Sequence, residues 1–172
     1  AILVVVGDWR GGDVIDVRHG YQCFYHSHRC GSVEHGHLHL FRCAVPDARD
    51  STPGHLIAIG LDARGLPVSM FTVNQWVTGG AWRDARATIA ALETARFDAA
   101  RGHALAGRWL NVFLRLYLPV AQRALLRRDA LLRRRSRGSS WQRVRRDQAI
   151  EVISRSRIDW LGDMHRLERL GA

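Results

Sequence analysis

The sequence predicts an α+β fold, in which an antiparallel sheet of about five strands packs against about four to five helices. Up to about residue 78, short β-rich runs are separated by Gly, Pro and Asp, as in strands joined by turns. After Gly79 and Gly80 the apolar residues recur at helical spacing. Because the strands precede the helices instead of alternating with them, we expect the helices to cover one face of the sheet.

The first half of the chain supplies the strands. The candidate strands are 2–6, 21–28, 35–43, 55–61 and 67–73, with a turn region at 11–16. Residues 35–43 alternate most strictly between polar and apolar side chains, which is typical of a half-buried strand. The sequence Asp-Ala-Arg-Gly at 62–65 has the composition of a tight turn and predicts a hairpin between the last two strands.

The second half of the chain supplies the helices. The candidate helices are 84–98, 103–118, 120–135, 139–154 and 159–170. Pro119 is expected to end or kink the second of these, because proline lacks the N–H that a helix interior requires. Ser139 and Gln142 have the spacing of a capping box, which predicts a helix start at that point.

Length and composition indicate one globular domain, residues 1–172, with a mostly β part (1–80) and a mostly α part (81–172). The chain has 172 residues, of which 47% are hydrophobic, enough for a core. Its N-terminal apolar run is far shorter than the roughly 20 residues of a membrane-spanning helix, which predicts a soluble protein. Three cysteines without C-x-x-C spacing, Cys23, Cys30 and Cys43, favour a reducing, cytoplasmic setting.

Positive charge is concentrated in the helical half. All 26 basic residues are arginine, which is typical of a GC-rich bacterial genome. Residues 1–80 carry six Arg and seven acids, a net charge of −1, whereas residues 81–172 carry twenty Arg and nine acids, a net charge of +11. Between Arg123 and Arg146 there are ten arginines and one acid, Asp129.

This basic stretch has several interpretations. It is either a solvated helical face enlarged by codon bias or a docking surface for an acidic partner or polyanion, with Arg133, Arg134 and Arg135 as the candidate binding residues. Trp141 is its single aromatic residue, so stacking with nucleic acid is less favoured, although it stays a third hypothesis. A non-catalytic accessory subunit that binds through these helices is therefore the alternative function.

Histidines gather in the first half of the chain at strand spacing. Five of the nine lie between residues 26 and 39, namely His26, His28, His35, His37 and His39. Side chains of a strand alternate between its two faces, so the histidines of each candidate strand share one face. A symmetric hairpin places His26 opposite His37 and the remaining pair, His28 and His35, opposite each other. Leu38 and Leu40 would then face the core.

Converging imidazoles predict a divalent-metal site. Opposed Cβ atoms lie roughly 5 Å apart, which lets two imidazoles reach one ion at about 2.0 to 2.1 Å. Neutral imidazole suits zinc, iron or copper, and two or three His ligands leave positions open for water or substrate. Glu34 is the nearest carboxylate and would be a ligand or a general base, while His19 and His55 would support the ligands. Ordinary hydrogen-bonded histidines are the alternative.

A second string predicts a ligand pocket at the junction between sheet and helices. Asn74, Trp76, Thr78 and Trp82 combine polar groups that can orient a small polar ligand with aromatic rings that can contact it. In the alternative interpretation, the two Trp residues anchor the core and Thr78 lies near a helix start.

Five strings of this sequence together resemble an uncharacterised family of bacterial proteins, a domain of unknown function. They lie at 12–14, 25–29, 34–41, 55–59 and 71–79. The most specific is Glu-His-Gly-His-Leu-His-Leu-Phe at 34–41. The resemblance implies that the whole chain is one domain, and it implies no activity. Sequence alone therefore predicts a His-ligated metal-binding protein and leaves open whether it is an enzyme.

Overall fold

The computed structural model describes residues 13–27, 34–43, 53–98 and 104–171. In these ranges the strands are β1 (Val14–Asp16), β2 (Tyr21–Ser27), β3 (Gly36–Arg42), β4 (Gly54–Leu61), β5 (Pro67–Val73) and β6 (Val152–Arg157). The helices are α1 (Gln75–Thr78), α2 (Ala85–Glu93), α3 (Ala104–Leu116), α4 (Leu118–Arg135), α5 (Trp141–Arg145) and α6 (Trp160–Gly171), with a 3-10 turn, η1 (Ser136–Gly138). The candidate strand 2–6 lies outside the described residues.

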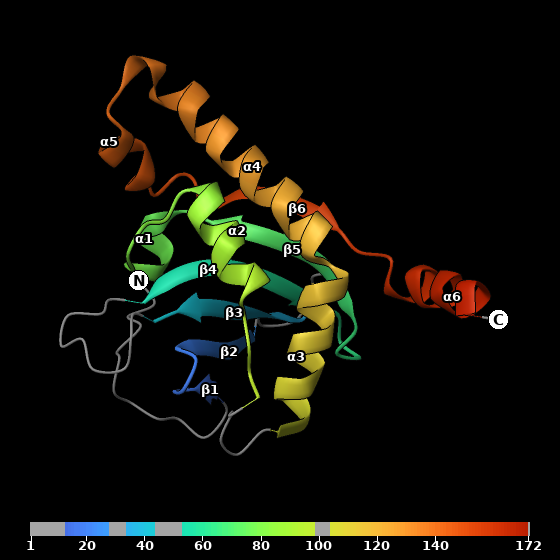
Figure 1. Ribbon diagram of the computed structural model, residues 1–172. Coiled ribbons are helices and arrows are strands. Elements are labelled where there is room, and N and C mark those ends of the chain that lie inside the picture. Colours follow the sequence, from blue (N-terminus) through green and yellow to red (C-terminus); the bar gives the residue numbers. More distant parts are fainter. Residues whose placement is uncertain (1–12, 28–33, 44–52, 99–103, 172) are drawn as a thin grey trace.

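The strands form one antiparallel sheet in the order β1-β2-β3-β4-β5-β6 (Figure 1). With the helices that follow, this sheet confirms the predicted α+β class. The predicted hairpin between β4 and β5 is present, and Gly65 takes the left-handed conformation (φ 79°) that its turn requires. Residues 14–16, which we expected in a turn, instead form β1, because Val14 pairs with Cys23 of β2 and packs into the core.

Helices α2, α3 and α4 cover one face of the sheet, as predicted (Figure 1). Leu40, Ile57 and Met70 of the sheet meet Leu110 and Leu125 of the helices in the core, and each is at most 1% exposed. Burying a side chain of this size stabilises the fold by about 1.5–3 kcal/mol. The helix layer therefore buries one face of the sheet in the core, while the opposite face carries other side chains.

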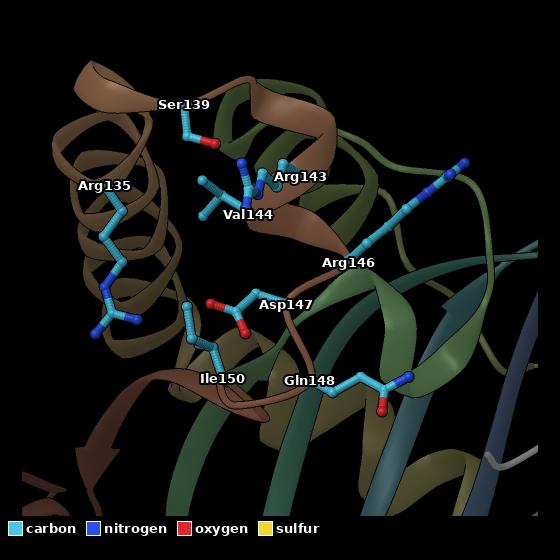
Figure 2. A pocket seen from close by; sticks show the side chains of 8 residues that line it. All are labelled: Arg135, Ser139, Arg143, Val144, Arg146, Asp147, Gln148 and Ile150. Carbon is cyan, nitrogen blue, oxygen red and sulfur yellow. The ribbon is translucent and has the colours of Figure 1, made fainter.

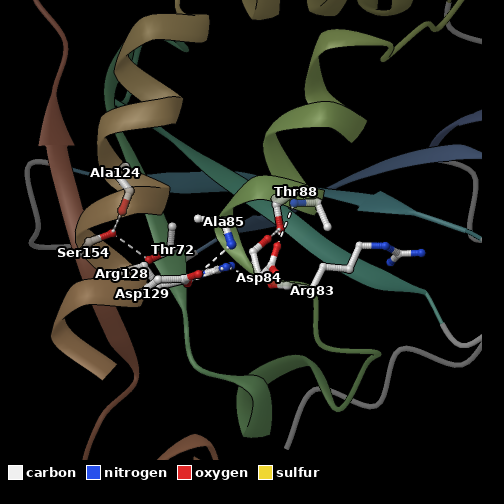
Figure 3. A network of polar contacts seen from close by, with 10 residues as sticks. Thr72, Arg83, Asp84, Ala85, Thr88, Ala124, Arg128, Asp129 and Ser154 are labelled. Atoms are coloured by element: carbon white, nitrogen blue, oxygen red, sulfur yellow. Dashed lines mark hydrogen bonds and ion pairs between the residues drawn. The ribbon is translucent and has the colours of Figure 1, made fainter. Parts of the chain in front are cut away.

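A buried ion pair joins α4 to the segment that precedes α2 (Figure 3). Arg128 is 3% exposed, and its guanidinium donates to Asp129 Oδ1 at 2.8 Å and to the Arg83 carbonyl oxygen at 2.8 Å. The other oxygen of Asp129 accepts from the Ala85 N–H at 2.7 Å, in the first turn of α2. The single acid of the basic stretch is thus an internal partner, and it fixes the start of α2 against α4.

Hydrogen bonds also fasten the edge strand β6 to α4 (Figure 3). The Ser154 hydroxyl donates to the Ala124 carbonyl oxygen at 2.8 Å and accepts from the Thr72 hydroxyl at 2.7 Å. All three atoms are buried, so each hydrogen bond satisfies a polar group that would otherwise be costly.

The predicted helix over 139–154 is wrong in its second half. Helix α5 ends at Arg145, and the residues that follow a short loop form β6. The predicted capping box of Ser139 and Gln142 is wrong, because the side chain that caps α5 is that of the neighbouring Ser140, which accepts from the Arg143 N–H. After Val152 and Ile153, residues 154–157 alternate Ser and Arg and offer no apolar side chain, so pairing with β5 and contact with α4, not local pattern, make 152–157 a strand.

Two other helix boundaries have identifiable causes. The chain breaks between α3 and α4 at Tyr117, and Pro119 lies in the first turn of α4, where a missing N–H costs nothing. Helix α2 ends at Glu93, earlier than the predicted residue 98, because Phe97 turns into the core and donates its N–H to the Asn111 side chain at 2.9 Å.

The last helix, α6, matches its predicted range and projects from the body of the protein (Figure 1). Its first turn is held by Trp160, which packs against Phe113 and Tyr117, and by Asp163, which accepts from the Tyr117 hydroxyl at 2.7 Å. In the described part of the chain, no helix is both long and apolar enough to cross a bilayer.

We expect Arg128→Ala to lower the free energy of unfolding by about 3–5 kcal/mol, because it leaves Asp129 buried without its charged partner. Arg127, an exposed residue of the same helix, is the matched control, and Arg127→Ala should change stability by less than about 0.5 kcal/mol. Urea unfolding of both variants measures the difference. Equal losses would show that the buried pair does not hold α4 to α2.

Candidate functional site

Four histidines form a line across β2, β3 and β4, which we call the imidazole row: His26, His37, His39 and His55. His26 and His37 are paired across β2 and β3, in the predicted register, with ring centroids 5.4 Å apart. The rings of His37 and His39 are 4.5 Å apart, and those of His39 and His55 are 5.1 Å apart. The hairpin of β2 and β3 therefore brings together three of the predicted ligands, and β4 adds His55 as a fourth imidazole.

The row lies on the sheet face opposite to the helix layer. Strand alternation sends Leu38 and Leu40 toward the core, as predicted, and sends His37 and His39 to the other face. These two histidines are nevertheless buried, with 6% and 2% of their surface exposed. Aromatic rings contact the row, namely Phe24, Phe41 and Phe71. Such apolar surroundings strengthen any electrostatic interaction that the imidazoles make.

A β-bulge places His55 in the row. The register between β3 and β4 shifts after Leu40, so that Phe41 pairs with His55 and not with Leu56. Leu56 consequently packs into the core beside Ile57, and His55 falls on the face of the imidazoles. Regular alternation counted back from Ala58 would have put position 55 on the core face, so only the bulge brings His55, predicted in a supporting role, into the row.

His39 and His55 are in direct contact through their ring nitrogens. Nδ1 of His39 lies 3.0 Å from Nε2 of His55, so the N–H of one ring donates a hydrogen bond to the nitrogen of the other. Burial, aided by the positive charge of Arg128 and by electrostatic interaction with His37, lowers the pKa of His55 to about 3, although the residue is partly exposed. His55 is therefore neutral at ordinary pH, which is the form that can bind a metal ion.

Glu34 lies beside the row and holds His37 by a hydrogen bond. Its Oε1 accepts from His37 Nδ1 at 3.2 Å, and its Oε2 accepts from the Ser69 hydroxyl at 3.1 Å and from Arg155 of β6. A Cβ at Gly60 would collide with this carboxylate, so glycine is needed where Glu34 lies against β4.

The same contacts set the protonation of Glu34. Burial by itself would raise its pKa, but the hydrogen bonds and charges of His37, Arg155 and Ser69 outweigh burial and hold the pKa at about 2. A carboxylate of such low basicity is a poor general base. Its geometry fits the positioning of an imidazole better than the removal of a proton from a substrate.

Other predicted histidines lie elsewhere. His35 precedes β3, is exposed, and has its Nδ1 2.9 Å from the Tyr25 hydroxyl. His28 and the helix candidate His103 lie outside the described residues, and His19 contacts Asp16 at 2.9 Å at the β1–β2 turn. In the segments that the structure describes, no three His, Cys, Asp or Glu side chains converge closely enough to hold a metal ion as they stand.

Where the ligand pocket was predicted, the structure has a small cavity of about 10 Å³ beside His55. Asn74, Thr78 and Trp82 line it, and that volume holds about one water molecule. Trp76 is not among its lining residues and donates its Nε1–H to the Ile150 carbonyl oxygen at 2.8 Å. The Asn74 side chain accepts from the Gln75 N–H and donates to the Val144 carbonyl oxygen, so it links α1 to α5.

The predicted arginine triplet forms the C-terminal end of α4. Arg133, Arg134 and Arg135 are all exposed, at the end of the helix where positive charge interacts favourably with the helix dipole. Cys23 is buried, which raises the pKa of its thiol, with help from Asp13, and makes it a structural core residue.

The chain matches a known protein family. Residues 9–158 match a family described as a domain of unknown function, DUF6969, so the match includes the whole imidazole row. No curated protein and no solved structure matches the chain. The expectation of an uncharacterised family is confirmed at this level.

The metal-free protein should lose stability as the pH falls. Between pH 6.5 and 3 the unfolded chain protonates His55 while the folded protein does not, and between pH 4.5 and 2 the same holds for Glu34. We expect His55 to lower the free energy of unfolding by up to about 1.4 kcal/mol for each pH unit of acidification in its range.

His55→Gln should flatten the decrease between pH 6.5 and 5, and Glu34→Gln should flatten it below pH 4.5. Urea unfolding of the chelator-treated protein across this range measures both slopes. His165→Gln, at an exposed site on α6, is the control. An unchanged slope in His55→Gln would contradict the burial of a neutral imidazole.

Proposed function

Because the chain belongs to the DUF6969 family, a domain of unknown function, we propose a function from its side chains: the imidazole row binds a divalent transition metal ion. The contact between His39 and His55 carries this proposal. Two imidazole nitrogens that bind one tetrahedral ion at about 2.0 to 2.1 Å lie roughly 3.3 Å apart, and Nδ1 of His39 and Nε2 of His55 are 3.0 Å apart. If the two rings moved slightly apart and the donor ring changed its tautomer, the ion could bind between the two nitrogens.

His37 is the proposed third ligand. Its ring centroid is 4.5 Å from that of His39, so a modest rotation would bring it toward the pair. Its Nδ1 is held by Glu34, which makes Nε2 the nitrogen that would bind the ion. Histidine ligands in metal sites typically donate their other ring N–H to a carboxylate, which orients the ring and increases its basicity.

Glu34 is therefore assigned to orienting His37 and not to binding the ion. The carboxylate already neutralises Arg155 and accepts from Ser69, and release for metal binding would leave that arginine without its partner. Arg155 is itself held over the Phe71 ring, 4.3 Å from its centroid, so both ends of the ion pair are fixed.

Ligand type limits the metal. Neutral imidazoles in apolar surroundings suit zinc, iron or copper and not calcium or magnesium, which take oxygen ligands. With two or three imidazoles the ion keeps positions for water or substrate, as catalytic sites do. His26, at the end of the row, and the predicted ligands His28 and His35 are further donors that this proposal does not require.

The cellular setting that we propose is a bacterial cytoplasm. In the described residues Cys23 and Cys43 are free thiols, which fits a reducing compartment. The exclusive use of arginine as the basic residue fits a GC-rich genome. We take the His-rich string at 34–41 as the sequence signature of the metal-binding face.

The proposed metal site predicts which histidines contribute to metal affinity. Tag-free protein reconstituted with zinc, iron or copper should bind about one equivalent by elemental analysis, since one row supplies one ligand set. His39→Ala and His55→Ala should each lower affinity by more than the roughly 10–100-fold that follows loss of a supporting hydrogen bond.

His165→Ala, at an exposed site on α6, should bind metal like the parent protein. Less than about half an equivalent after reconstitution with each of the three metals would rule out the site, because a preformed pair of neutral imidazoles should bind at least one of them.

Glu34→Gln tests the positioning role separately. Gln keeps the size of the side chain but loses the charge that orients His37, so metal affinity should fall by about 10–100-fold while the stoichiometry stays the same. Competition with a coloured chelator measures the affinity, and Glu168→Gln, at an exposed site on α6, is the control. If Glu34→Gln abolished stoichiometric binding under saturating metal, Glu34 would be a ligand after all.

A further inference from the structure

A large pocket lies far from the imidazole row, between the C-terminal end of α4, η1, α5 and the loop that leads to β6 (Figure 2). Its volume is about 740 Å³, which is within the range of roughly 300–1,000 Å³ for sites that bind small molecules. The lining residues are Arg135, Ser139, Arg143, Val144, Arg146, Asp147, Gln148 and Ile150.

The pocket carries a net positive charge. Three arginines and one aspartate among its lining residues sum to +2. In the described part of the chain, neither Arg135 nor Arg143 takes part in an ion pair, in contrast to Arg128 and Arg155, which are used inside the fold. In Figure 2 Arg146 extends away from Ser139 and Arg143, so it contributes charge at the rim. An anion would find two guanidinium groups not engaged by carboxylates.

Ser139 provides an independent sign of a missing ligand. Its Oγ is buried, and it has no hydrogen-bond partner among the described residues. Buried hydroxyls in folded proteins are nearly always hydrogen-bonded, so this atom is expected to have an acceptor or donor in the complete complex. Ser139 and Arg143 point into the same space in Figure 2, so one bound group could contact both.

The opposite side of the pocket has a different character. Asp147 accepts from the Ala149 N–H at 3.0 Å, which fixes its carboxylate in a turn beside the apolar side chains of Val144 and Ile150. A carboxylate here repels a bare polyanion but accepts hydrogen bonds from hydroxyl or amino groups. The fitting ligand is therefore anionic at one end and carries hydrogen-bond donors at the other.

We propose that this pocket binds a small phosphomonoester of a hydroxylated molecule. The phosphate lies between Arg143 and the Ser139 hydroxyl, which donates to it, and the hydroxyl groups of the ligand donate to Asp147. Arg135 adds positive charge from the α4 side of the pocket. A phosphomonoester carries close to two negative charges at neutral pH, which balances the +2 of the lining residues. Arginine is suited to this role because its planar group can donate two parallel hydrogen bonds to phosphate oxygens.

Calorimetric titration of the full chain with ribose 5-phosphate, glucose 6-phosphate and adenosine monophosphate tests the proposal. Saturable binding of at least one ester is expected, with much weaker binding of ribose, glucose and inorganic phosphate. Arg143→Gln should weaken it by about tenfold or more, and Ser139→Ala by several-fold, because charged hydrogen bonds are stronger than neutral ones. Arg135→Gln, which removes charge from the α4 side of the pocket, should weaken it by several-fold.

The neighbouring arginines of α4 provide matched controls. Arg133→Gln and Arg134→Gln remove the same charge from the same helix end but from side chains that do not line the pocket, so they should change affinity by less than about twofold at moderate salt. Equal weakening by these controls would overturn the proposal in favour of a general electrostatic surface.

Three other results would also overturn it. One is the absence of saturable binding by any of the three esters. Another is inorganic phosphate binding as tightly as the esters, which would show an anion site without an ester pocket. The third is displacement of the bound ester by duplex DNA, or by vesicles that contain acidic lipid, which would show that the pocket is part of a polyanion-binding surface. Metal loading plays no part in any of these measurements, so they are independent of the imidazole row.

Discussion

The pairing register of β2 with β3 is the constraint on which both faces of the sheet depend. Side chains alternate with a period of two, so a slip by one residue would exchange the faces of the whole strand. Leu38 and Leu40 would leave the core, and His37 and His39 would enter it beneath the helices. The free energy of burying leucine side chains, about 1.5–3 kcal/mol each, therefore also holds the imidazoles on their face.

The two layers of the protein are electrostatically connected. Arg128 and Asp129 pair on α4 and bind the segment that begins α2, and the positive charge of Arg128 also contributes to the low pKa of His55 at the edge of the imidazole row. Arg155 of β6 pairs with Glu34 and thereby fixes the orientation of His37. Arginines that sequence composition would group with the basic surface thus act inside the fold, where they keep one imidazole neutral and another in place.

The described part of the molecule contains two regions of different chemistry. One region is the imidazole face, where apolar rings and neutral nitrogens favour a soft cation. The other is the α4–α5 pocket, where Arg135, Arg143 and a buried hydroxyl favour an anion. The imidazole face and the α4–α5 pocket favour ions of opposite charge, and they lie in different parts of the molecule. Binding at each can therefore be measured separately.

Local pattern by itself determined the α+β class, the alternation of β3, the opposition of His26 and His37, and the break near Pro119, because each depends on residues close in sequence. Only the tertiary structure decided the rest. The bulge that brings His55 to His39, the strand at 152–157 and the pairing of Glu34 with Arg155 all join distant segments. Their free energy comes from contacts across the sheet and helix layer, and no local window of sequence contains both partners.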